Sequence, residues 1–216
     1  MLNKLIRCLA DIKQGRAGFE TLPAAFWDSE IYGSLVYFDW RALQFIAEED
    51  VTAEIVAIAM DQSALALQFV PRALKSAGIC ERAVRSEEGA IAFVPPELAS
   101  ETMYAHWIGH LETSGFPDPD CLQEVPLRFR NEVICTAAVR LNAGNIFAVP
   151  PSMHTPQVVA AYLESECGDI YIEDLPKQLR TVPLCCALLE RGLGELKDVP
   201  DDVRALLPQS PRVAGG

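Results

Sequence analysis

The stretch that decides the fold runs from Glu54 to Ser100 and reads EIVAIAMDQSALALQFVPRALKS, then Ala77, then GICERAVRSEEGAIAFVPPELAS. The second segment matches the first after a shift of 24 residues. In this match Leu67 corresponds to Ile91, and Phe69-Val70-Pro71 corresponds to Phe93-Val94-Pro95. A fixed period of this length is typical of repeat architectures, in which successive units stack and bury each other's apolar faces.

One proline in each unit allows the period to be followed along the chain. We call these residues the anchors, and they number the copies from first to eighth: Pro23, Ala47 in place of a proline, Pro71, Pro95, Pro126, Pro150, Pro176 and Pro200. The spacing is 24 residues except for seven extra residues before Pro126 and two before Pro176. The residues one and four positions before every anchor are apolar. The sequence therefore predicts eight copies.

Each copy begins with a helical pattern, shown most clearly in the sixth copy by the apolar stripe Ile134, Cys135, Ala138 and Val139. We expect a turn to follow, and glycines mark it in four copies: Gly89, Gly144, Gly168 and Gly194. A second apolar segment leads into the anchor and is expected to be partly 3₁₀. The predicted fold is all-α, a solenoid of about eight 24-residue two-helix repeats. Residues 1–207 would form a single domain, with residues 208–216 as a disordered tail.

The terminal copies depart from the pattern as the ends of an array should. Arg7 and Asp11 stand where the third copy has Ile55 and Ala59, so the first copy is expected to cap the array with a polar face.

The repeat pattern from Glu54 to Leu74 and its echo VICTAAVRLNAGNIFAVPPSM, from Val133 to Met153, resemble an uncharacterised bacterial repeat family with the same period. The proline anchor is a departure, because that family often has alanine or serine there. Leucine-rich-repeat variants, built from an α-helix and a 3₁₀-helix, are a looser match. The resemblance implies an all-helical array and a bacterial origin, and it carries over no catalytic residue.

Charge restricts the classes of partner. The net charge is −12 and the pI is about 4.7, so the chain should repel nucleic acids and anionic membranes and attract a basic protein. The N-terminal sequence lacks the features of a Sec signal, and no apolar run is long enough to span a bilayer. Seven cysteines spread through helical segments favour free thiols and a reducing, cytoplasmic compartment.

Four cysteines share one position, 15 residues before their anchors: Cys8, Cys80, Cys135 and Cys185. Free cysteine packs as a small hydrophobic residue, so these are expected in the core. Cys121 and Cys167 lie near the extra residues and are expected to be more exposed.

His106 and His110 lie on one face of a predicted helix, and with Cys121 they are candidates for a metal site or a Cys–His catalytic pair. The alternative is ordinary histidines at the edge of a core stripe. Nucleotide-binding, hydrolase and zinc-protease motifs are missing from the sequence. We therefore predict no catalytic residue, no metal and no cofactor, and a protein that is not an enzyme.

The extra residues of the fifth copy indicate where a partner would bind, because insertions in repeat arrays map to loops on one face. The segment from His110 to Asp120 is predicted to be a loop in which Phe116 lies beside Asp118 and Asp120. Further candidate contacts are the acidic runs Glu48, Glu49, Asp50 and Glu164, Glu166, Asp169. The alternatives are that Phe116 covers the widened copy and that the acidic runs only keep the chain soluble.

These features together predict a protein-binding repeat protein. The specific hypothesis is an immunity-type bacterial inhibitor that neutralises a basic toxin. One alternative is a host-directed effector that is exported without a Sec signal and acts by protein binding. Another is an enzyme with a Cys/His site in the fifth copy.

Overall fold

The computed structural model describes residues 2–114, 120–165 and 171–208. These residues form α-helices and 3₁₀-helices (η), and the described part of the chain contains no strand. None of the described helices combines the length and apolar character needed to cross a membrane. The chain divides into two compact units, Met1–Met103 and Tyr104–Gly216, with the division inside helix α5 (Glu101–Ser114). Each unit is described by itself.

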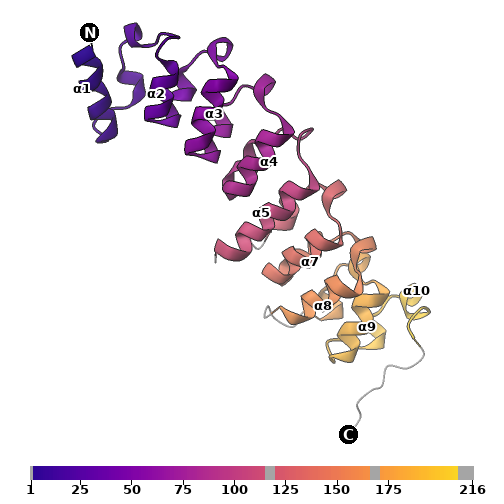
Figure 1. Cartoon of the computed structure of the whole chain (residues 1–216). Coiled ribbons are helices and arrows are strands. Elements are labelled where there is room, and N and C mark those ends of the chain that lie inside the picture. Colours follow the sequence, from indigo (N-terminus) through magenta and orange to yellow (C-terminus); the bar gives the residue numbers. More distant parts are fainter. Residues whose placement is uncertain (1, 115–119, 166–170, 209–216) are drawn as a thin grey trace. The chain divides into compact units, whose positions relative to one another are not determined.

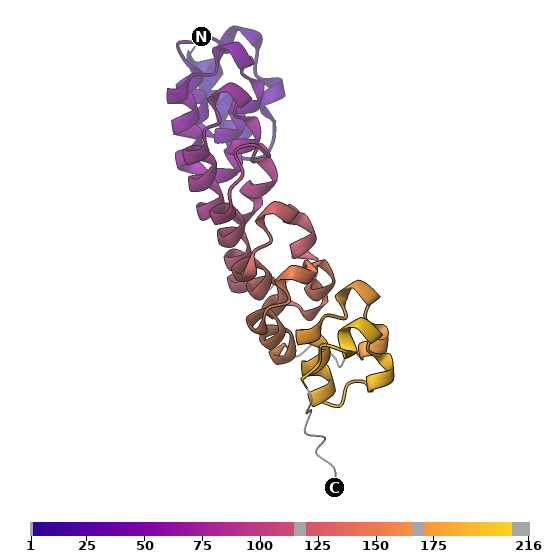
Figure 2. The same cartoon turned by 90° about the vertical axis from the view of Figure 1, so that its right-hand side faces the viewer.

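In unit 1, α-helices alternate with short 3₁₀-helices. Its elements are α1 (Leu2–Lys13), η1 (Phe19–Thr21), η2 (Ala24–Phe26), α2 (Tyr32–Phe38), η3 (Trp40–Phe45), η4 (Glu48–Asp50), α3 (Ala53–Gln62), η5 (Ala64–Phe69), η6 (Arg72–Leu74), α4 (Ala77–Ser86), η7 (Glu88–Phe93) and the start of α5. Within this unit the α-helices lie along one side and the 3₁₀-helices along the other (Figures 1 and 2).

Unit 2 has the same alternation. After the remainder of α5, its elements are α6 (Cys121–Glu124), η8 (Leu127–Phe129), α7 (Glu132–Leu141), η9 (Ala143–Ala148), η10 (Pro151–Met153), α8 (Pro156–Glu164), η11 (Ile172–Asp174), η12 (Lys177–Leu179), α9 (Val182–Glu190), η13 (Leu196–Asp198) and α10 (Asp201–Arg204). Most copies in both units therefore contain an α-helix, a 3₁₀-helix before the anchor and another after it. The two-helix prediction missed the last of these.

The α-helices start where a capping side chain is available. The residue five positions after the anchor accepts a hydrogen bond from the backbone N–H three residues on. This holds for Thr52 (3.3 Å to Ile55), Ser76 (3.3 Å to Ile79), Ser100 (3.3 Å to Met103), Asn131 (2.9 Å to Ile134) and Thr155 (3.4 Å to Val158). Such a bond satisfies one of the N–H groups that a helix start leaves without a partner. The cap therefore sets the helix start relative to the anchor.

A single extended residue separates each of several α-helices from the following 3₁₀-helix. Ser63 and Asn142 both have φ −155°, and their side chains accept from the N–H two residues on, at 3.2 and 2.8 Å. The expected glycine turn is wrong in two copies, because Gly89 and Gly144 lie inside η7 and η9. Gly194 does lie between α9 and η13, and Gly168 is outside the described residues.

The helices α1 and α9, which belong to the first and eighth copies, end differently. Gly15 and Gly192 have φ of 68° and 75°, the left-handed region that glycine enters without steric penalty. The next residue then bonds back into the helix, from Arg16 N–H to the Asp11 carbonyl at 2.9 Å and from Leu193 N–H to the Leu188 carbonyl at 2.9 Å. This is a Schellman-type helix end.

The anchors share one backbone conformation. Pro23, Pro71, Pro126, Pro150 and Pro176 have φ between −59° and −53° and ψ between 140° and 142°. Ala47 adopts the same values, φ −60° and ψ 140°, so its backbone conformation matches that of the proline anchors. The proline ring fixes φ, so the anchor directs the chain into the second 3₁₀-helix without a further loss of conformational freedom.

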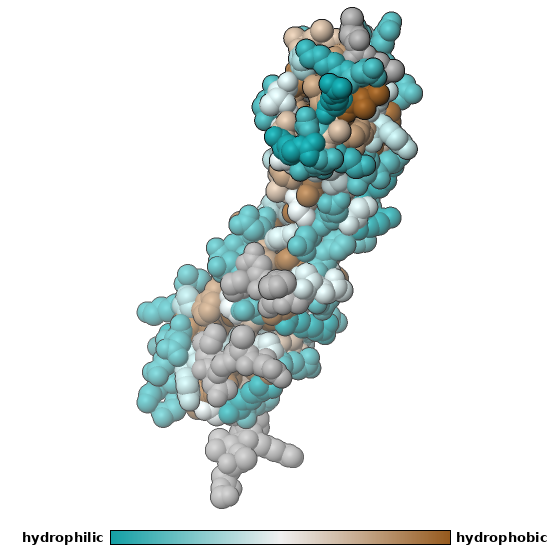
Figure 3. Space-filling model, turned by 90° about the vertical axis from the view of Figure 1, so that its left-hand side faces the viewer, coloured by the Kyte–Doolittle hydropathy of each residue, from teal (hydrophilic) through white to brown (hydrophobic). Residues whose placement is uncertain are grey.

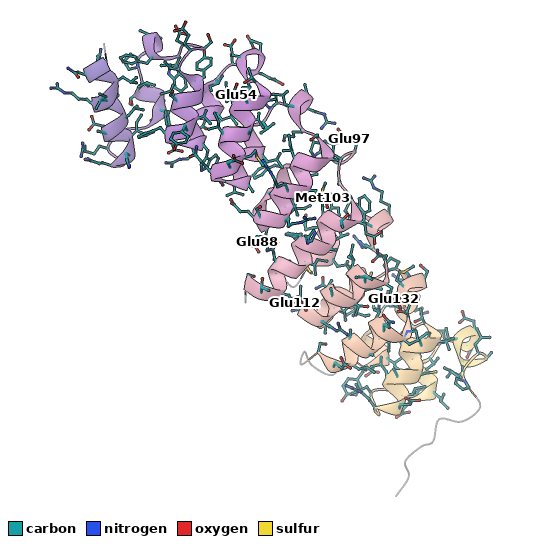
Figure 4. The ribbon with its side chains drawn as sticks, viewed as in Figure 1. Glu54, Glu88, Glu97, Met103, Glu112 and Glu132 are labelled. Atoms are coloured by element: carbon teal, nitrogen blue, oxygen red, sulfur yellow. The ribbon has the colours of Figure 1, made fainter. Side chains whose placement is uncertain are left out.

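The core consists of the repeated apolar positions. Leu43, Leu67, Leu122, Ile146 and Ile172, each four residues before an anchor, are at most 1% exposed. The helical stripe Ile134, Cys135, Ala138 and Val139 is buried to the same degree. Met103 of α5, labelled in Figure 4, is 1% exposed. Ile91 and Val94 are only half-buried, and Leu196, in the last copy, is 50% exposed.

The N-terminal end of unit 1 has the polar character expected of a cap. Arg7 is exposed, and Asp11 forms an ion pair with Arg16. In Figure 3 this end faces the viewer at the top, and hydrophilic residues surround smaller hydrophobic areas there.

Basic side chains four residues after the anchors join successive copies, a role that the sequence analysis did not predict. Arg130 donates to the carbonyls of Val125 (2.7 Å), Gln123 (3.2 Å) and, in the next copy, Ala148 (2.7 Å). Arg180 does the same with Leu175, Glu173 and Asp198, at 2.9, 3.0 and 2.8 Å. In unit 1, Lys75 donates to the Phe93 carbonyl at 2.9 Å. These bonds satisfy carbonyls at the ends of short helices, which have no intrahelical partner.

The core positions differ in burial, and this gives a graded test. Replacing Leu67 with alanine should lower the free energy of unfolding by roughly 2–5 kcal/mol, because Leu67 is fully buried and its loss leaves a cavity. Ile91→Ala should have a smaller effect, and Leu196→Ala should stay within about 0.5 kcal/mol because the side chain is half exposed. Urea unfolding followed by circular dichroism measures all three. Equal effects at Leu67 and Leu196 would contradict this description of the core.

Candidate protein-binding surface

Aromatic residues are concentrated at the start of unit 1. Residues 19–45 contain eight of the chain's 17 aromatic residues. The ring of Phe45 lies 6.0 Å from that of Phe19 and 5.7 Å from that of Trp27, centroid to centroid, and Trp27 lies 6.5 Å from Tyr32. Phe19 is 4% exposed, whereas Phe45 is 38% exposed. Phe45 is therefore an exposed ring held in place by rings beneath it.

The same region is strongly acidic. Residues 20–50 contain seven acidic side chains and one basic side chain, Arg41, which gives a net charge of −6, half of the −12 of the whole chain. Arg41 is engaged by Asp39, with Nη2 2.5 Å from Oδ2. Burial raises the pKa of Asp39, but the hydrogen bonds and the charge of Arg41 outweigh burial and hold this pKa below its usual value. The remaining six carboxylates are exposed and dominate the local field.

The predicted acidic run lies next to the aromatic cluster. Glu48, Glu49 and Asp50 form η4, and all three are exposed. The Tyr32 hydroxyl donates to Asp50 Oδ2 at 3.4 Å, which connects the run to the ring cluster. We call these residues the aromatic–acidic surface: Phe19, Trp27, Tyr32, Phe45, Glu48, Glu49 and Asp50.

The other predicted contact residues belong to unit 2. His110 was predicted both on a helix, together with His106, and at the start of the loop. Because α5 extends to Ser114, the helical prediction is confirmed and the predicted start of the loop is wrong; the residue is half-buried. The reason is that α5 has 14 residues where α3, α4 and α7 have 10, so four of the seven extra residues lengthen the helix. Asp120 is exposed and its Oδ1 accepts from Gln123 Nε2 at 2.8 Å. Glu164 is exposed at the end of α8. Phe116, Asp118, Glu166 and Asp169 lie outside the described residues, so their roles stay predictions.

All four cysteines of the shared position were predicted to lie in the core, and the prediction is confirmed for three of them. Cys80, Cys135 and Cys185 are fully buried, whereas Cys8 is half-buried. Burial raises the pKa of the Cys135 and Cys185 thiols to about 11, so neither is a ready nucleophile at neutral pH. The expectation that Cys121 is exposed is wrong. It begins α6, which packs on α7 and η9, and it is fully buried.

Thiol reactivity should follow this burial. Because alkylation needs an accessible thiolate, Cys8 and Cys186, which are half-buried, should react before Cys80, Cys121, Cys135 and Cys185. Limited labelling with iodoacetamide, followed by peptide mass spectrometry, gives the order, and labelling in urea is the control. Reaction of Cys121 as fast as Cys8 would contradict the packing of α6.

The three histidines lie in different surroundings. His106 and His110 are half-buried in α5, and the described residues contain no group of three His, Cys, Asp or Glu side chains that could hold a metal ion. His154 is 3% exposed, and its Nδ1 lies 2.9 Å from Thr181 Oγ1. It occupies the position four after the anchor that holds Arg130 and Arg180 in neighbouring copies. Burial lowers the pKa of His154 below its usual value of 6.5.

This burial makes stability depend on pH. When the pH falls below about 6.5, the unfolded chain binds a proton at His154 that the folded chain resists, so the free energy of unfolding should fall. The slope from this group is at most about 1.4 kcal/mol per pH unit. His154→Gln should reduce the loss of stability between pH 7 and pH 5. Urea unfolding at several pH values measures the difference. Identical pH profiles for wild type and His154→Gln would rule out this role.

Phe45 and Trp27 were not among the predicted contact residues, although two features of the sequence point to them. Phe45, Phe69 and Phe93 recur at the same position, two residues before consecutive anchors. The aromatic and acidic residues are also concentrated in the same 32 residues, 19–50, which a count along the chain reveals. Neither signal says which rings are exposed.

The chain matches no protein-family model, and no curated protein and no solved structure matches it either.

Proposed function

We propose that this protein is a helical-repeat array of about eight copies that binds another, basic protein. The array is supported by the recurrence of capped α-helices, anchors and 3₁₀-helices in both units. Repeat arrays present long surfaces in which the core positions are fixed and the outward positions are free to specialise for a partner.

The observation that carries the proposal is the aromatic–acidic surface of unit 1. An exposed ring supported by other rings offers apolar contact area without a large loss of side-chain entropy on binding. Phe45 on Phe19 and Trp27 has this geometry. A net charge of −6 in residues 20–50 would steer a basic surface toward it and reject nucleic acids.

The biological role that we propose is inhibition, of the kind carried out by bacterial immunity proteins on basic toxins. An acidic protein that covers the basic surface of an enzyme competes with its substrate by mass action, and it needs no catalytic group of its own. The proposed compartment is the cytoplasm, consistent with the free thiols of Cys8, Cys80, Cys135, Cys185 and Cys186.

The test is binding to a partner recovered by cross-linking through a photoreactive residue at position 45. Phe45→Ala should weaken binding by roughly 1–3 kcal/mol, as expected for an aromatic anchor at an interface. The double variant Glu48→Gln and Glu49→Gln should mainly slow association and reduce its salt dependence. Calorimetry and stopped-flow fluorescence measure these effects, and the activity of the partner is assayed with and without this chain.

A matched control is Tyr37→Ala, which removes an aromatic that is 78% exposed but makes no ring contact with the aromatic–acidic surface. Its affinity should equal that of wild type. Unchanged affinity in the Phe45 and Glu48/Glu49 variants, with circular dichroism showing an intact fold, would place the binding surface elsewhere. A partner whose activity is unaffected by binding would rule out the inhibitory role.

A further inference from the structure

A groove of about 280 Å³ lies beside the aromatic–acidic surface, between the second and third copies in unit 1. Its floor is apolar and consists of Leu43, Ile46, Val51 and Val70, each at most 8% exposed. Phe69 forms one wall, and its ring centroid lies 6.0 Å from that of Trp40, which holds it in place. Such a groove suits an aliphatic or aromatic side chain of a bound segment.

The rim of the groove is polar and carries side chains of both charges. Glu48, Gln44 and Arg72 lie along it. Arg72 is already paired with Glu97, which is labelled in Figure 4, so its charge is compensated. Glu48 is exposed and forms no ion pair with any described residue, and Glu49 and Asp50 follow it directly. The uncompensated charge at the groove is therefore negative.

We propose that this groove binds one extended segment of the partner, in which an apolar side chain enters the groove and an adjacent lysine or arginine pairs with Glu48. This proposal rests on the protein-binding function proposed above and specifies its ligand. The apolar floor alone would accept many segments, and the carboxylate selects those with a neighbouring positive charge. Charge complementarity favours a basic segment over an acidic one, because an acidic side chain near Glu48 to Asp50 would meet only repulsion.

The test uses a phage-displayed library of random peptides selected on the immobilised full chain. Selected peptides should combine a large apolar residue with lysine or arginine within two positions. Glu48→Gln should weaken the binding of a fluorescein-labelled selected peptide by about tenfold, the loss that corresponds to about 1.4 kcal/mol. Glu48→Arg should reverse the charge preference, so that the same peptide with glutamate in place of its basic residue binds better than the original.

The control is Glu88→Gln, which neutralises an exposed carboxylate on η7 outside the groove and should leave peptide affinity unchanged. Selected peptides without basic residues, or equal affinity for wild type, Glu48→Gln and Glu48→Arg, would overturn the proposal. These results are distinguishable from failure of the proposed function. If a basic protein partner binds wild type and Glu48→Arg equally, the protein-binding function stands and the groove assignment fails. If basic peptides occupy the groove but no basic protein is bound or inhibited, the groove assignment stands and the proposed function fails.

Discussion

The structure depends on satisfying the backbone polar groups at the ends of short helices. An α-helix leaves four N–H and four C=O groups without intrahelical partners at its ends, so a chain of 3- to 14-residue helices has many to satisfy. The sequence supplies partners at fixed distances from each anchor. Thr52 and Asn131 cap helix starts, Ser63 and Asn142 cap the following 3₁₀-helices, and Arg130 and Arg180 bind carbonyls of two copies. Side-chain hydrogen bonds therefore maintain the period together with apolar packing.

This requirement also separates the positions that can carry function from those that cannot. Anchors, caps and core residues such as Leu67 are fixed by the fold, so specialisation is left to the outward positions. Two positions before the anchor, the chain places Phe45 in the second copy but Ala148 in the sixth. One position after the anchor, it places Glu48 in the second copy and Arg72 in the third. The aromatic–acidic surface results from such differences in residue type at outward positions that recur in each copy.

The period also places cysteine and histidine side chains at structural positions of the described core. The thiols of Cys135 and Cys185 lie at a core position, where burial raises their pKa and removes the thiolate that a nucleophile or metal site needs. His154 stands at the position of a carbonyl-binding arginine and is buried beside Thr181. Cys135, Cys185 and His154 thus contribute to packing and hydrogen bonding.

By itself, the sequence determined the helical class, the period, the anchors and most of the core, because apolar periodicity and the fixed φ of proline are local properties. It placed Ala47 correctly as an anchor, and it identified Cys80 and Cys135 as core residues. Tertiary structure decided how many of the extra residues lengthen a helix, and so extended α5 to Ser114 and buried Cys121. Tertiary structure also decided which of the aromatic side chains remain exposed to solvent. Phe45 and Phe19 both contact the ring of Trp27 and yet differ in exposure, because burial depends on contacts between residues far apart in the chain, which leave no local pattern in the sequence.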